Sequence, residues 1–154
     1  MNTNIDKYKN DLDKLIEKGV LLSFAMLSEC SPPDEFEKQF KEAFGVEFLD
    51  YKDKIPNFKM EYQSWYSEAL LCVKQLLPDR LKDFTELYKP TIKRTKISCE
   101  NYTIFDYLQG LQMKNPFAEV IVKKDAAIPK FCQQLLIVVS IKKRFESSSF
   151  QTYK

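Results

Sequence analysis

Basic side chains are the strongest candidates for chemistry in this sequence. They form two clusters, one within residues 89–96 and one at residues 142–144. Lysine and arginine contact phosphate oxygens, and the threonine hydroxyls within the first cluster are further donors to phosphate. Lys93, Arg94 and Lys96 are therefore the candidate nucleic-acid-binding residues. The alternative, which the near-neutral total charge favours, is that these side chains are simply solvated.

Acidic side chains offer a second candidate site, for a divalent cation. Asp79, Asp83 and Glu86 are three or four residues apart, so a helix would place them on one face. No second acidic helix of matching spacing accompanies them, and Arg80 and Lys82 lie close enough to neutralise them. The pattern therefore favours a solvated helix face and predicts no metal site.

Histidine is absent from all 154 residues. Its absence excludes Ser-His-Asp and Cys-His catalysis, as well as metal binding through imidazole. The glycine-rich motifs of phosphate loops and dinucleotide sites are missing, and so is the G-x-S-x-G nucleophile elbow. We therefore expect no catalytic residue and no cofactor, and we predict that the protein is not an enzyme.

Helices are the elements expected to position these residues. Only three glycines occur, which disfavours folds built from many tight hairpin turns. Through most of the chain, apolar residues recur at the three- and four-residue spacing of an amphipathic helix. Aromatic residues at this spacing, namely Tyr62, Trp65 and Tyr66, are expected in the core rather than in a stacking site. The spacing predicts helices over about 4–29, 32–44, 57–77, 81–88, 103–111 and 126–147.

Capping residues mark where these helices begin and end. Ser31 and Asn57 are predicted N-caps, and Thr103 opens a capping box with an acidic residue three positions later. Gly45 and Gly110 stand where a helix ends in the left-handed conformation. The caps and stops thus predict separate helices joined by short connectors.

The remaining pattern predicts only a small sheet. Residues 117–122 are the one strand candidate, because they are β-prone, and we expect them to pair with residues 97–99. Gly19 is a weak point of the first helix, since glycine disfavours a helix interior. The expected fold is a mainly α, single-domain helical bundle over residues 1–154, with five to six helices and at most a minor two-stranded β element.

The final predicted helix is apolar nearly all round. Residues 135–139 are five consecutive apolar residues, and in a helix they point in every direction. A small helical domain buries one wide stripe, so the apolar surface left over is expected at an interface. We predict a homodimer, or docking of a helical partner domain, through Leu135, Leu136 and Val139. The alternative is a central helix wrapped completely within one subunit.

Cysteine usage and hydropathy indicate the compartment. The four cysteines are far apart and form no C-x-x-C pair, which fits a reducing cytosol. The N-terminus lacks a basic segment followed by an apolar one, and the longest apolar run is far too short to span a bilayer. The sequence therefore predicts a cytoplasmic protein with no membrane partner.

Three segments resemble one known family. They are KQLLPDRL at residues 74–81, YTIFDYLQGL at residues 102–111, and the stretch from AIPKF to KKRFESS at residues 127–148. Together they resemble the N-terminal region of a bacterial family of uncharacterised proteins, over about residues 60–150. The resemblance implies that longer members continue into a helical region of the HEPN type found in toxin and defence systems. It also implies that this chain is a truncated member or an excised domain.

The resemblance supplies no catalytic residue. Its matching motifs are features of helices and turns, and the HEPN ribonuclease motif requires a histidine that this sequence lacks. We therefore expect a non-catalytic helical module for protein interaction or self-association, linked to a bacterial toxin or defence system. The alternative is a nucleic-acid-binding accessory domain that uses the basic loop.

Overall fold

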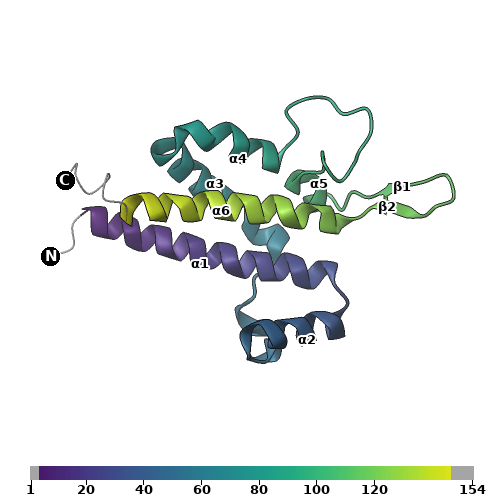
Figure 1. Cartoon of the computed structure of the whole chain (residues 1–154), viewed down its shortest axis with the longest axis horizontal. Coiled ribbons are helices and arrows are strands. Elements are labelled where there is room, and N and C mark those ends of the chain that lie inside the picture. Colours follow the sequence, from purple (N-terminus) through teal and green to yellow (C-terminus); the bar gives the residue numbers. More distant parts are fainter. Residues whose placement is uncertain (1–3, 147–154) are drawn as a thin grey trace.

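Three helices form the centre of the fold: α1 (Asn4–Cys30), α3 (Phe58–Leu76) and α6 (Ile128–Glu146). α6 packs against α1 and α3, and α4 (Leu81–Tyr88) covers a further side of α6. α1 and α6 lie antiparallel along the long axis of the molecule (Figure 1). The computed structural model describes residues 4–146, and it confirms a mainly α bundle of six helices with one two-stranded sheet. The predicted end of the last helix at Ser147 lies outside the described residues.

Gly19 allows the three central helices to approach one another closely. A Cβ atom at residue 19 would come within 2.6 Å of Leu135 Cδ1 on α6 and 3.1 Å of Trp65 Nε1 on α3. Trp65 is fully buried, and its indole N–H donates to the carbonyl oxygen of Leu15 at 2.9 Å. Gly19, predicted as a weak point of the first helix, is therefore a position where the three helices pack closely.

A buried glutamine links α3, α4 and α6. The Tyr62 hydroxyl donates to Gln134 Oε1 at 2.7 Å, and Gln134 Nε2 donates to the carbonyl oxygen of Phe84 at 3.0 Å. All three residues are fully buried, and burial raises the pKa of the Tyr62 hydroxyl well above its ordinary value. Because every polar atom of this link has a partner, the link fixes how the helices pack. The predicted core location of Tyr62, Trp65 and Tyr66 is confirmed.

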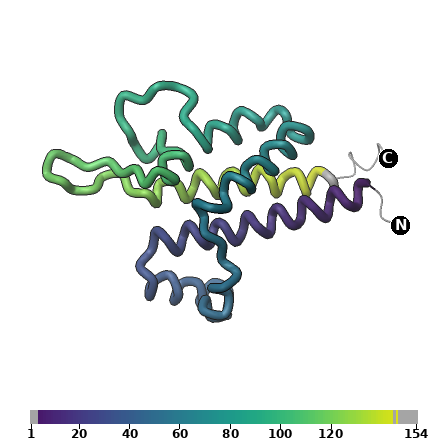
Figure 2. Tube along the Cα trace, turned by 180° about the vertical axis from the view of Figure 1, so that it is seen from behind, coloured from purple at the N-terminus to yellow at the C-terminus, as the bar shows by residue number. Residues whose placement is uncertain are grey.

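α2 (Pro33–Phe44) forms a separate lobe beside α1. Its buried Phe36 and Phe40 pack with Phe48 of the following turn and with Phe24 of α1, apart from the main core. Figure 2 shows this lobe projecting from the bundle. A cluster of phenylalanine rings is thus enough to hold a short helix outside the main core.

Most predicted helix ends are confirmed. The Asn57 side chain caps α3 by accepting from the Met60 N–H at 3.1 Å, and Gly45 ends α2 with a φ of +71°. The prediction for Ser31 is wrong, because α2 begins at Pro33 after an N-cap residue, Pro32, that makes no capping bond. Proline suits the first helical turn, where its missing N–H would have no partner inside the helix.

The small sheet is a local hairpin. β1 (Met113–Lys114) pairs antiparallel with β2 (Val120–Val122). The predicted partner of this strand, residues 97–99, is wrong, because those residues form a turn around Asn101. There the Ser98 N–H donates to Asn101 Oδ1 at 2.8 Å. Pairing across a short turn also costs less chain entropy than pairing with a distant segment.

A helix that crosses a bilayer must be both long and apolar. None of the helices between residues 4 and 146 has the length and apolarity that a bilayer span requires.

Candidate interaction site

An open groove lies between α4, the loop at residues 89–103 and α6. Its volume is about 680 Å³, and its lining includes apolar side chains from all three elements. Leu136 of α6 is 65% exposed there, and Ile92 of the loop is 80% exposed. The apolar lining consists of Leu87, Pro90, Ile92, Leu136 and Ile137. We call this feature the α4–α6 groove.

Helical periodicity explains why Leu136 faces the groove. Gln133, Leu136 and Ser140 all line the groove at three- and four-residue spacing, so they share one side of α6. The opposite sides are covered, because Val138 is fully buried and Ile141 almost so. α6 therefore has neighbours on most of its circumference and leaves open one strip, in which Leu136 is the exposed apolar residue between Gln133 and Ser140.

A buried ion pair fixes the loop that borders the groove. Arg94 Nη1 donates to Asp106 Oδ2 at 2.6 Å, and Arg94 Nη2 donates to Asp106 Oδ1 at 2.9 Å. The side chain of Arg94 is 18% exposed and that of Asp106 is 3% exposed. Arg94 Nη1 also donates to the carbonyl oxygen of Asn101 at 3.1 Å. The two hydrogen bonds to Asp106 form a bidentate pair, which is the strongest geometry between an arginine and a carboxylate.

The same carboxylate caps α5 (Ile104–Leu108). Thr103 accepts from the Asp106 N–H, while Asp106 Oδ2 accepts from the Thr103 N–H at 2.8 Å, as the predicted capping box requires. Burial alone would raise the pKa of Asp106. The hydrogen bonds from Arg94 and Thr103 outweigh burial and lower that pKa below its ordinary value. Asp106 is therefore ionised at neutral pH and holds both the loop and the helix start.

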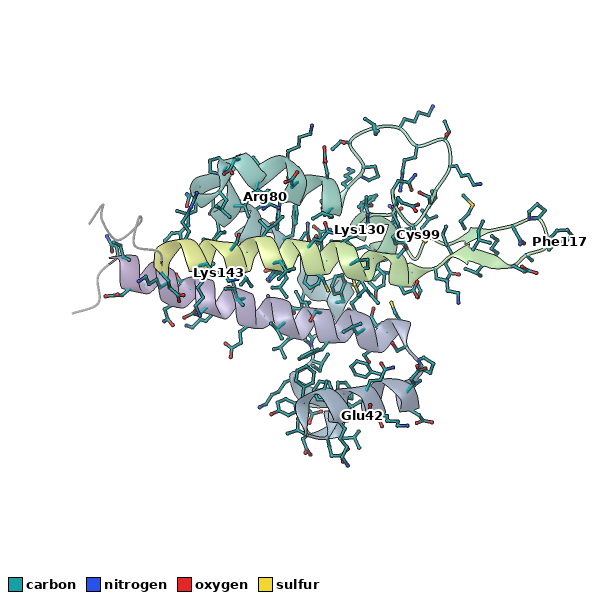
Figure 3. The ribbon with its side chains drawn as sticks, in the orientation of Figure 1. Glu42, Arg80, Cys99, Phe117, Lys130 and Lys143 are labelled. Atoms are coloured by element: carbon teal, nitrogen blue, oxygen red, sulfur yellow. The ribbon has the colours of Figure 1, made fainter. Side chains whose placement is uncertain are left out.

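Charged side chains stand at both ends of the groove, as the labelled Arg80 and Lys130 show in Figure 3. At one end, Arg80 Nε donates to Asp83 Oδ2 at 3.0 Å. At the other end, Lys130 Nζ donates to the carbonyl oxygen of Glu100 at 2.7 Å. Hydrogen bonds from its own backbone N–H and from Ser98 lower the pKa of Glu100. The groove therefore combines apolar side chains with charged side chains at its rim.

The structure separates the predicted phosphate contacts. Arg94 is engaged with Asp106, whereas Lys93 and Lys96 are exposed on the loop. The second basic cluster lies at the other end of the bundle, where Lys142 Nζ pairs with Asp13 Oδ1 at 2.9 Å; Figure 3 labels its neighbour Lys143. The two clusters do not form one surface. Nucleic-acid binding stays a prediction that depends on Lys93 and Lys96.

The three predicted interface residues differ in their surroundings. Leu135 is half-buried over Gly19, Val139 is half-buried, and only Leu136 is mainly exposed. The acidic residues of α4 form ordinary helix pairs, such as Lys82 with Glu86 at 3.9 Å. Between residues 4 and 146 no group of three or more acidic or cysteine side chains is arranged to hold a metal ion.

Sequence reasoning missed the tip of the β1–β2 hairpin. Asn115 Oδ1 accepts from the N–H groups of Phe117 and Glu119, both at 2.9 Å, and Ala118 adopts a φ of +64°. Phe117 is 84% exposed at this tip, far from the bundle in Figure 3. The Asn115-Pro116 pair signals a turn, but it gives no indication that the turn displays an aromatic ring.

Comparison with protein-family models, curated proteins and solved structures finds no match for this chain. The resemblance to a bacterial family therefore stays a prediction. The α4–α6 groove, with its exposed Leu136 and Ile92, is the candidate site for an interaction.

Proposed function

We propose that this chain is a non-catalytic helical interaction module that self-associates through the α4–α6 groove. The observation that carries the proposal is the 65% exposure of Leu136 beside the apolar lining of a groove of about 680 Å³. A single exposed leucine is ordinary on a protein surface. Leu136 differs because the half-buried Leu87 and the exposed Ile92 line the same groove, so apolar side chains of three elements face one another there.

Covering this groove removes apolar surface from water. Complete burial of one leucine side chain stabilises a complex by about 1.5–3 kcal/mol, before the cost of association is subtracted. The charged rim suits an interface, since interfaces combine an apolar centre with polar edges. A second copy of the chain or a helical partner domain would supply the missing cover for α6.

Light scattering on the purified chain tests this proposal. We expect a mass of twice 18.2 kDa at micromolar concentration, and we expect Leu136→Asp to reduce the mass to 18.2 kDa. Leu71→Asp is the matched control, because Leu71 is 55% exposed on α3 and does not line the groove. A wild-type mass of 18.2 kDa throughout, or a dimer that survives Leu136→Asp, would contradict the proposal.

A further inference from the structure

We propose that the tip of the β1–β2 hairpin of a second copy occupies the α4–α6 groove, with Phe117 as the anchoring residue. This inference rests on the proposed function, because it names the partner and the segment that enter the groove. Two features that otherwise have no role, a displayed aromatic ring and an open apolar groove, then explain each other.

The hairpin holds Phe117 ready for contact. Asn115 and Glu119 close the turn through the Asn115 N–H, which donates to the Glu119 carbonyl oxygen at 2.9 Å, and through Asn115 Nδ2, which donates to Glu119 Oε2 at 3.2 Å. With the two bonds to Asn115 Oδ1, these contacts fix the backbone on both sides of the ring. A backbone that is fixed before binding loses little entropy on association. The turn therefore presents Phe117 from a backbone that need not rearrange.

The groove suits an aromatic ring in size and chemistry. Its volume of about 680 Å³ exceeds that of one phenyl ring, and Leu87, Ile92 and Leu136 line it. Aromatic side chains inserted into apolar pockets dominate the binding energy of many interfaces. Leu136 and Phe117 are both exposed and would cover each other. One contact would therefore remove two apolar side chains from water.

Charge favours the hairpin over a second groove as the occupant. The cations at the rim are engaged, since Arg80 pairs with Asp83 and Lys130 donates to a backbone carbonyl. The Glu86 carboxylate has only a loose contact with Lys82 at 3.9 Å, whereas the Glu100 carboxylate accepts hydrogen bonds from its own backbone N–H and from Ser98. Glu86 is therefore the rim carboxylate with room for a further cation.

The hairpin supplies such a cation. Lys114 of β1 is exposed three residues before Phe117, and within residues 4–146 it forms no ion pair. Glu86 at the rim and this lysine have complementary charges, whereas two grooves brought face to face would place two copies of Glu86 near one another.

The arrangement requires a second molecule. In Figure 1 the hairpin extends along the long axis away from the bundle, whereas the groove is lined by residues of α4, α6 and the loop between α4 and α5. The loop at residues 89–103 borders the groove and is anchored by the Arg94–Asp106 pair, so the groove stays on the bundle while the hairpin points away from it. Exchange of hairpins between two copies would make the same contact twice and close a two-fold dimer.

Light scattering and energy transfer between labelled chains test the exchange. We expect Phe117→Ala to weaken dimerisation by about tenfold or more, the effect typical of a hot-spot residue. Met60→Ala is the matched control. Met60 is 79% exposed on α3, does not line the groove and is not part of the hairpin. Circular dichroism confirms that each variant retains its helices.

Mixing the two defective variants gives the decisive measurement. The Phe117→Ala chain keeps an intact groove, and the Leu136→Asp chain keeps an intact hairpin tip. Reciprocal exchange predicts that an equimolar mixture associates more tightly than either variant alone, because the mixed dimer keeps one of the two contacts intact. Absence of recovery in the mixture would overturn the inference.

The outcomes separate this inference from the proposed function. If Leu136→Asp is monomeric but Phe117→Ala still dimerises, the groove is an interface with another occupant and the inference is wrong. If the wild-type chain is monomeric at every concentration, both proposals fail. If both variants associate more weakly than the wild type and the mixture associates more tightly than either, both proposals are supported.

Discussion

The loop at residues 89–103 and the β1–β2 hairpin both lie between helices in the chain, yet they lie differently on the molecule. Both are connectors that contain lysine and lack helical periodicity. The loop is tied to α5 by the buried Arg94–Asp106 pair, whereas the hairpin is held by hydrogen bonds around its own Asn115. The difference teaches that a buried ion pair, together with the buried ring of Tyr102, can place an irregular segment against the bundle.

The largest expected effect is the loss of the loop's ion pair. Arg94→Ala leaves the Asp106 carboxylate buried without its charged partner, and we expect a loss of about 3–5 kcal/mol in the free energy of unfolding. Urea denaturation followed by the fluorescence of Trp65, the single tryptophan, measures this loss. Lys93→Ala is the control, and it should change stability by less than about 0.5 kcal/mol. Equal stability of the two variants would show that the Arg94–Asp106 pair does not hold the loop.

Acid should weaken the loop before it affects the hairpin. Because the folded-state pKa of Asp106 lies below its unfolded value, the carboxylate contributes stability at neutral pH. That contribution is lost as the pH falls below about 4, towards and through the folded-state pKa. Hydrogen exchange across this range should therefore rise first at residues 94–106. An exchange pattern that changes equally in residues 113–122 would contradict this expectation.

A smaller effect is expected when the turn of the hairpin is disrupted. Asn115→Ala removes two side-chain acceptor bonds at the tip and should cost about 1 kcal/mol, confined to the hairpin. The exchange rate of the Phe117 amide proton should rise while the unfolding midpoint of the helices stays close to wild type. Cooperative loss of helix content in this variant would show that the hairpin supports the bundle.

The smallest effect on stability is expected at the ring itself. Phe117 is 84% exposed, so Phe117→Ala should change the free energy of unfolding of the monomer by less than about 0.5 kcal/mol. Thermal unfolding at low concentration measures this value in isolation from any association. A large destabilisation would mean that the ring has a structural role within its own subunit.

Local spacing explains which parts of the fold were predictable. The helices follow from apolar periodicity, and the capping box follows from Thr103 and Asp106 being three residues apart. The bond between Arg94 and Asp106 spans twelve residues of irregular chain, and no local pattern reports it. The strand pairing with residues 97–99 failed for a related reason. A side chain, that of Asn101, takes the backbone bonds that a strand partner would need.

The candidate site was predictable only in part. The wholly apolar stretch at residues 135–139 indicated an interface, but it did not indicate which residue remains uncovered. That choice depends on tertiary contacts: Gly19 leaves space for Leu135 beside α1, while Leu136 stays 65% exposed. The display of Phe117 likewise depends on where the hairpin points, which composition does not determine.

The central position of α6 has a consequence for the order of folding. α6 is synthesised last among the described elements, yet it fills the space between α1, α3 and α4. Contacts such as Gly19 with Leu135 and Asp13 with Lys142 join segments separated by most of the chain, and such contacts form slowly. On the ribosome, the apolar faces of α1 and α3 therefore stay open until α6 emerges. We expect the nascent chain to depend on chaperones during that interval and to become independent of them once α6 packs.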